Sequence, residues 1–168
     1  MSRTALSTVH EKILSVCQQW PREAWDDSEK AALALTRRMA RAVGHAEVEH
    51  CMASVDKQSP PGVFTYSVAV ITADLVVAGT LAAGPEMTGP RRAAADVFIV
   101  PRSAVRSLTV HHVDQDDSPS GVDIVVFTAE YPGMPPLKAV ERSNGQYDGS
   151  VGALFDALRA DLAATGRG

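Results

Sequence analysis

Apolar and polar residues alternate with a period of two along residues 63–83, which predicts two strands there. The polar step Thr72-Ala73-Asp74 interrupts the apolar run and predicts a tight turn. We therefore expect an antiparallel hairpin, whose first strand has an apolar side made of Phe64, Tyr66, Val68 and Val70. Because an isolated hairpin is marginally stable in water, further strands or a helix must cover its apolar side.

Two segments before the hairpin have apolar residues at helical spacing. The first runs from Thr4 to Trp20 and stops before Pro21. The second begins near Asp26, where Glu29 completes a capping box, and it ends at Gly44. Both are expected to be amphipathic, and the apolar stripe of the second consists of Ala32, Leu35, Met39 and Val43.

Short alternating runs predict five more strands and a closing helix. The strand before the hairpin would place Val48, His50 and Met52 on one side. The strands after it are expected at residues 97–100, 105–113, 122–127 and 137–141. Ser150 would cap the final helix, whose apolar residues are Val151, Leu154, Phe155, Leu158 and Leu162.

These elements predict an α+β protein in which two N-terminal helices precede a seven-stranded antiparallel curved sheet capped by a C-terminal helix. Consecutive strands joined by short turns favour a meander, and seven twisted strands curl toward a barrel or two packed sheets. We expect residues 1–44 to form a helical pair packed on a domain of residues 45–168.

Composition and charge argue against some classes of protein but do not identify a specific function. The 168 residues are 45% hydrophobic and 21% charged, which is typical of one globular domain. The sequence has neither a signal peptide nor an apolar run near the roughly 18 residues that span a bilayer, so we expect a cytoplasmic protein. A net charge of −4 argues against nucleic-acid binding, which depends on basic residues. Cys17 and Cys51 are expected to be free thiols.

Two stretches resemble those of bacterial members of the pleckstrin-homology (PH) superfold. They are the turn in Val70-Ile71-Thr72-Ala73-Asp74-Leu75-Val76-Val77 and the strand start in Val100-Pro101-Arg102-Ser103-Ala104-Val105-Arg106-Ser107-Leu108. Seven antiparallel strands followed by one helix is also the element order of that superfold. The resemblance covers about residues 46–165 and implies a PH-like barrel.

The PH resemblance implies a non-catalytic binding or scaffolding domain without a cofactor. In lipid-binding members of the superfold, the loop after the first strand carries several basic residues. Here that loop, residues 56–62, has only Lys57, which argues against phosphoinositide recognition. Members also bind peptides along a sheet edge, so the expected partner is a protein or peptide.

A second fold is compatible with the pattern, namely a curved-sheet cup of the NTF2-like or helix-grip type. Such cups often enclose a small ligand, and some are enzymes. Tyr66, His50 and Tyr131 would be the polar groups of the pocket in that case. An enclosed cavity of several hundred cubic ångströms would distinguish a cup from a filled barrel.

Candidate chemistry is sparse, and we expect neither a catalytic nor a metal site. His111, His112 and the loop Asp114–Asp117, with carboxylates at Asp114, Asp116 and Asp117, hold the only clustered metal-ligand atoms. Adjacent strand residues point to opposite faces, so the two imidazoles could share a metal only at a bulge or a strand end. We expect solvated or structural roles for this cluster and a partly buried, hydrogen-bonded His50.

The basic residues give the remaining candidates for partner binding. They are Arg37, Arg38, Arg41, Arg91, Arg92, Arg102 and Arg106. The three on the second helix are compatible with an acidic docking partner, and also with a solvated helix end where the macrodipole favours cations. The apolar stripe of the first helix must be buried on the sheet, on the second helix or on another copy, which raises the hypothesis of a homodimer through the N-terminal helices.

Overall fold

A computed structural model describes residues 5–57, 62–84, 95–115, 122–140 and 151–165. The helices are α1 (Ala5–Val16), α2 (Asp27–Val43) and α3 (Val151–Thr165), with a short 3-10 turn η1 at Arg102–Ala104. The strands are β1 (His50–Lys57), β2 (Phe64–Ile71), β3 (Leu75–Ala83), β4 (Asp96–Pro101), β5 (Ser107–Gln115), β6 (Val122–Glu130) and β7 (Leu137–Val140). The chain divides into two compact units, Met1–Ile99 and Val100–Gly168. This division falls at a different place from the boundary at residue 44 that the sequence suggests.

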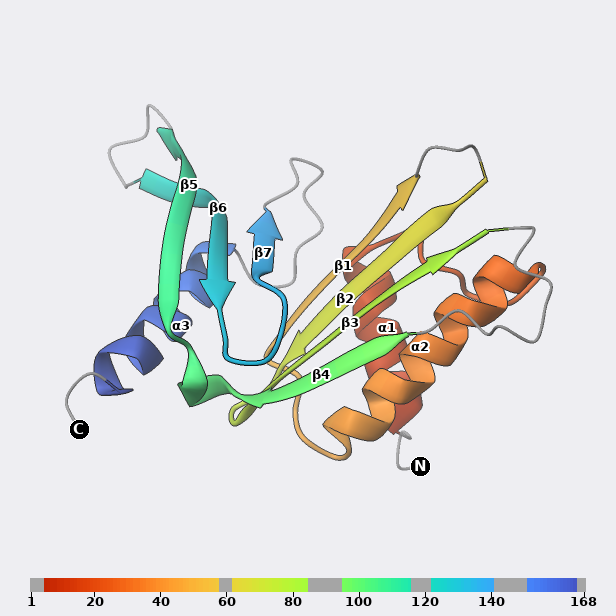
Figure 1. Cartoon of the computed structure of the whole chain (residues 1–168), viewed down its shortest axis with the longest axis horizontal. Helices are drawn as coiled ribbons and strands as arrows, with labels where there is room; N and C mark the ends of the chain where they lie inside the picture. The colour runs from red at the N-terminus through yellow and green to blue at the C-terminus, as the bar shows by residue number, and fades with distance from the viewer. Residues whose placement is uncertain (1–4, 58–61, 85–94, 116–121, 141–150, 166–168) are drawn as a thin grey trace. The chain divides into compact units, whose positions relative to one another are not determined.

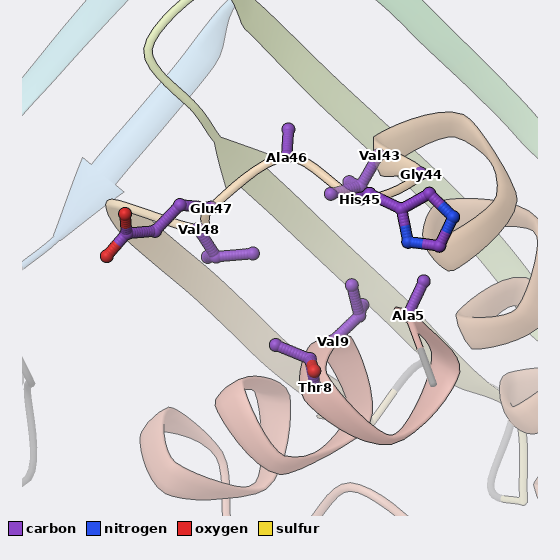
Figure 2. A pocket seen from close by; sticks show the side chains of 9 residues that line it. All are labelled: Ala5, Thr8, Val9, Val43, Gly44, His45, Ala46, Glu47 and Val48. Atoms are coloured by element: carbon purple, nitrogen blue, oxygen red, sulfur yellow. The ribbon is translucent and has the colours of Figure 1, made fainter. Parts of the chain in front are cut away.

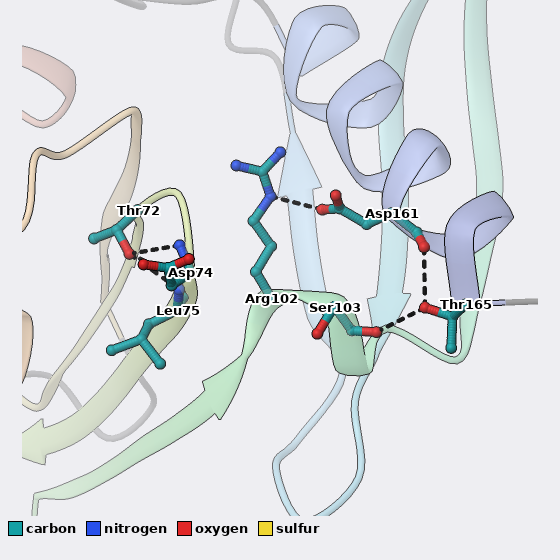
Figure 3. A network of polar contacts seen from close by, with 7 residues as sticks. All are labelled: Thr72, Asp74, Leu75, Arg102, Ser103, Asp161 and Thr165. Carbon is teal, nitrogen blue, oxygen red and sulfur yellow. Dashed lines mark hydrogen bonds and ion pairs between the residues drawn. The ribbon is translucent and has the colours of Figure 1, made fainter. Parts of the chain in front are cut away.

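The first unit contains a four-stranded antiparallel sheet in the order β1-β2-β3-β4, with both helices on one face (Figure 1). The predicted hairpin is confirmed, with Phe64 opposite Ala83 and Ile71 opposite Val76. Thr72 forms its turn because its hydroxyl oxygen accepts hydrogen bonds from the backbone N–H groups of Leu75 (3.0 Å) and Asp74 (3.3 Å) (Figure 3). Register and turn therefore follow from the local sequence.

The helices bury their apolar stripes against this sheet and against each other. Trp20, Ile13, Leu35 and Met39 are at most 1% exposed, and they share a core with Tyr66, Val68 and Val70 of β2. Val9 and Ile13 of the α1 stripe are thus buried within the chain, whereas Leu6 at its start is 41% exposed. The homodimer through the N-terminal helices stays a prediction.

The predicted ends of α2 are confirmed. The Asp26 carboxylate accepts from the Glu29 N–H (2.7 Å), and the Glu29 carboxylate accepts from the Asp26 N–H (3.3 Å), which completes the capping box. Gly44 ends the helix with a φ of 64° and donates its N–H to the Ala40 carbonyl (2.9 Å). These caps fix where the helix begins and ends.

The close approach of α2 to β3 depends on Gly79. A Cβ at this position would lie 2.7 Å from Leu35 Cδ1 and 3.1 Å from Met39 Sδ. Any side chain there would therefore force those two core residues to move. Glycine is selected at Gly79 by the space between helix and sheet and needs no special backbone angle to explain it.

The second unit contains a three-stranded antiparallel sheet in the order β5-β6-β7 together with α3. Phe127 of β6 is fully buried, and its ring meets Phe155 of α3 edge-on at 5.3 Å. The apolar stripe of α3 is buried at Val151, Leu154 and Leu158, as the sequence predicted. The expected cap Ser150 lies outside the described residues.

The α+β class is confirmed, but the single seven-stranded sheet or closed barrel is wrong. The described strands form separate sheets of four and three, because the chain leaves β4 through Pro101 and η1 before β5 begins. The turn η1 was not predicted. The side given to Val48 is also wrong, because Val48 precedes β1 and is buried with Cys51 and Ala53. His50 is half-buried, as the sequence predicts, and so is Met52.

Candidate functional site

The most distinctive surface of the first unit is the exposed side of α2. Burial of Leu35, Met39 and Val43 fixes the rotation of this helix, so Arg37, Arg38 and Arg41 are left exposed. We call these three arginines the basic face. Arg38 donates from Nη1 to the Ala95 carbonyl (2.8 Å) and so holds the chain just before β4. Arg37 and Arg41 have no ion-pair or hydrogen-bond partner among the residues that the structure describes.

The opposite end of α2 is acidic. Glu23, Asp26 and Asp27 are all exposed there, and we call them the acidic end. Lys30 Nζ lies 2.9 Å from Asp27 Oδ1, and this hydrogen bond raises the pKa of the Lys30 ammonium group. Negative charge at the helix start and positive charge toward its end both match the helix macrodipole. One helix therefore presents both signs of charge on its solvent side.

Trp25 stands beside the acidic end and is 84% exposed. Its backbone is held in place, since its N–H donates to the Glu29 carboxylate at 2.6 Å. A large aromatic side chain on an ordered backbone and in contact with water is typical of a protein contact surface. Sequence reasoning missed Trp25 because the residue carries no periodic signal.

A small pocket lies between the start of α1 and the link from α2 to β1 (Figure 2). It has a volume of about 170 Å³, and Val9, Val43 and Val48 form its apolar part, with Thr8, His45 and Glu47 adding polar groups. Ligand pockets for drug-sized molecules usually measure roughly 300–1,000 Å³. This pocket is therefore too small for the ligand-binding cup considered from the sequence.

Arg102 makes an ion pair within the second unit (Figure 3). Its Nε lies 2.6 Å from Asp161 Oδ2, and the two side chains are only 13% and 26% exposed. The Thr165 hydroxyl donates to the Ser103 carbonyl (3.0 Å), so α3 is attached to η1 at a second point. Arg102 thus helps to hold α3 on η1, and its role in partner binding stays a prediction.

Tyr66 and Tyr131 are both buried, but within the described ranges only Tyr66 has a hydrogen-bond partner. The Tyr66 hydroxyl lies 2.9 Å from the Ser28 hydroxyl, whereas the Tyr131 hydroxyl has no partner among the described residues. Burial raises the pKa of Tyr66, and burial together with nearby Asp161 raises the pKa of Tyr131 to about 12. Neither tyrosine is poised to lose its proton near neutral pH.

This difference gives a paired prediction for two Tyr→Phe variants. Tyr66→Phe should lower the free energy of unfolding by about 1–3 kcal/mol, because it leaves the buried Ser28 hydroxyl without its partner. Tyr131→Phe should leave stability unchanged or raise it, because a buried hydroxyl without a partner is removed. Urea unfolding followed by circular dichroism measures both, and an equal loss in the two variants would contradict the assignment.

The structure describes part of the predicted histidine and aspartate cluster on β5. His111 is exposed, and its Nε2 lies 2.8 Å from the Thr128 hydroxyl. The ladder between β5 and β6 shifts register on either side of His112, which is the irregularity that two neighbouring imidazoles would need. Asp116 and Asp117 lie outside the described residues. Among the residues that are described, no three metal-ligand side chains lie together.

Five of the seven arginines predicted to bind a partner lie among the described residues, three in the first unit and two in the second. Arg37, Arg38 and Arg41 lie together, and Arg102 is paired with Asp161. Arg106 is exposed in the second unit. Arg91 and Arg92 lie outside the described residues.

The two cysteines are free and buried, in agreement with the sequence. Burial raises the pKa of Cys51 to about 12, which removes it from consideration as a nucleophile at neutral pH. None of the described helices is both long and apolar enough to cross a bilayer.

Comparison with known protein families, with curated proteins and with solved structures found no match for this chain.

Proposed function

We propose that this protein is a non-catalytic binding or scaffolding protein of the PH-like type, and that it contacts a protein or peptide partner through the basic face of α2. The PH-like part of the proposal is supported by the order of elements, since seven strands in two antiparallel sheets precede one helix. The choice of contact surface rests on the exposure of Arg37 and Arg41 and on their lack of an acidic partner in the part of the chain that the structure describes. They are exposed, lie one helical turn apart and have no acidic partner among the described residues.

The chemistry of the basic face selects an acidic partner. Guanidinium groups bind carboxylates through two parallel N–H donors, and two arginines at i and i+4 reach one extended acidic segment. Arg38 keeps the neighbouring chain in place through Ala95, so the surface around the two free arginines is ordered. The partner is therefore a protein segment rich in Asp or Glu.

Packing favours this proposal over the ligand-binding cup. At Gly79 the side chains of α2 touch β3 with no room for an added methyl group. Trp20, Leu35 and Met39 fill the layer between the helices and the sheet. A small ligand would have to displace these buried side chains to enter.

The test is binding of a fluorescein-labelled peptide of eight Asp and Glu residues, measured by fluorescence anisotropy. We expect binding at low ionic strength and loss at high ionic strength, because salt screens exposed charges. Arg37→Glu/Arg41→Glu should weaken binding about tenfold or more, which corresponds to about 1.4 kcal/mol.

The matched control is Lys138→Glu/Arg159→Glu, which changes the net charge by the same amount on exposed basic residues of the second unit. This variant should retain binding close to that of the wild type. Equal weakening in both double variants would mean that net charge alone attracts the peptide, and the proposed surface would then be wrong.

A further inference from the structure

We infer that the acidic segment bound by the basic face is the acidic end of α2 in a second copy of this chain, so that two α2 helices pair antiparallel. The inference rests on the proposed function, since it names the partner of the same surface. It differs from the homodimer suggested by the sequence, which relied on an unburied stripe of α1. Here the contact is the polar, solvent side of α2.

The residues on the solvent side of α2 are spaced symmetrically, so that the intervals between them are the same when read from either end of the helix. Its outward line consists of Asp27, Lys30, Ala34 and Arg37, separated by three, four and three residues. Residues three and four apart form one line along a helix. Because the spacing is symmetric, an antiparallel copy places Asp27 opposite Arg37 and Lys30 opposite Ala34. The two-fold axis repeats both pairings, and no like charges face each other.

The next residue on this line extends the match. Arg41 lies one turn beyond Arg37 and in the antiparallel arrangement reaches the region before the partner's helix, where Glu23 and Trp25 are exposed. Arginine binds the face of a tryptophan ring through a cation–π interaction as well as a carboxylate through hydrogen bonds. Contact with Arg41 of the second copy thus accounts for the 84% exposure of Trp25 in the single chain.

The helix macrodipole alone explains part of this pattern. It favours Asp27 at the start of α2 and Arg41 in its last turn. It does not explain why the large Trp25 side chain is 84% exposed, or why small Ala34 lies where Lys30 of a second copy would pass. The pairing accounts for all of these features together.

Exposed ion pairs are individually weak and are screened by salt. The pairing should therefore be reversible and dependent on concentration, and high ionic strength should dissociate it. Because Trp20 is 1% exposed and Trp25 is 84% exposed, a change of fluorescence on association should arise from Trp25.

Charge reversal in two complementary variants provides the test. One variant, Arg37→Glu/Arg41→Glu, is acidic at both ends of α2, and the other, Glu23→Lys/Asp27→Lys, is basic at both ends. Sedimentation velocity at low ionic strength should give dimers for the wild type and monomers for each variant alone. An equimolar mixture of the two variants should again dimerise, because opposite ends now match in the mixed pair. This rescue also shows that both variants are folded.

Lys138→Glu/Arg159→Glu is the control and should dimerise like the wild type. Trp25→Phe should abolish the fluorescence change that accompanies dimer formation. Wild-type protein that stays monomeric from micromolar to millimolar concentration overturns the inference, as does a mixture of variants that stays monomeric. If the wild type is monomeric yet binds the acidic peptide through Arg37 and Arg41, the proposed function stands and only the second copy is wrong.

Discussion

Leu35→Ala should lower the free energy of unfolding by about 2–5 kcal/mol, the usual cost of a large-to-small change in a closed core. Leu35 is fully buried, and its Cδ1 atom occupies the space above Gly79. The neighbouring side chains Met39 and Trp20 are themselves packed and cannot fill the gap fully. Urea unfolding followed by circular dichroism and by Trp20 fluorescence measures the loss.

Leu33→Ala is the matched control, since it makes the same chemical change on the same helix. Leu33 is only half-buried, so less apolar surface and a smaller cavity are involved. The loss should be clearly smaller than for Leu35→Ala. A similar loss in both variants would show that the change in helix sequence, and not the packing on β3, controls stability.

Alkaline pH should destabilise the protein more than it destabilises a Cys51→Ala variant. Burial raises the pKa of the Cys51 thiol from 9.0 to about 12 in the folded chain. Above pH 9 the unfolded chain releases this proton while the folded chain keeps it, so the free energy of unfolding falls as pH rises. The contribution is complete below pH 9 and is lost as pH approaches 12, with a slope of up to about 1.4 kcal/mol per pH unit.

The measurement is urea unfolding at several values between pH 8 and 11, where the difference between wild type and Cys51→Ala should change steadily with pH. Other groups titrate in the same range, but they do so in both proteins and cancel. Iodoacetamide should also modify Cys51 in urea and not in the native protein, because the thiol is buried. A constant difference across this range would mean that the thiol pKa is not raised.

Local signals determined the elements that the structure confirms. Asp26 and Glu29 lie three residues apart, and the Thr72 hydroxyl accepts a hydrogen bond from Leu75 within the same turn. The helix cap and the hairpin turn therefore form without contacts to distant residues. The apolar stripe of α2 is likewise buried where its helical spacing predicts. These features depend on side chains acting within a few positions of their own backbone.

The β1 strand shows where a local pattern is insufficient. Val48 was expected on the side of His50 and Met52, yet it precedes the strand and is buried with Cys51. If the extended backbone begins one residue earlier or later, each side chain of the strand points to the opposite face of the sheet. That starting point is set by the pairing of His50 with Ile71, a contact between residues distant in sequence.

The arginines likewise show that distant contacts decide what the local sequence leaves open. Arg41 and Arg102 are alike in sequence context, as each is an arginine near an element end. Arg102 is paired with Asp161 across a long stretch of chain, whereas Arg41 is left in water by the rotation of α2. Sequence alone cannot separate a paired arginine from a free one, because the partner is supplied by the fold.

The sequence by itself determined the two N-terminal helices, the caps of α2, the central hairpin, the apolar stripe of α3 and the α+β class, although α1 ends at Val16 and not at the predicted Trp20. Each of these follows from periodicity or capping over a few residues. Tertiary structure alone decided that the strands divide into sheets of four and three, that Gly79 admits Leu35, and which arginines stay exposed. The physical reason is that strand pairing, packing and ion pairing join residues far apart in the chain, and the energies of those contacts leave no periodic trace in the local sequence.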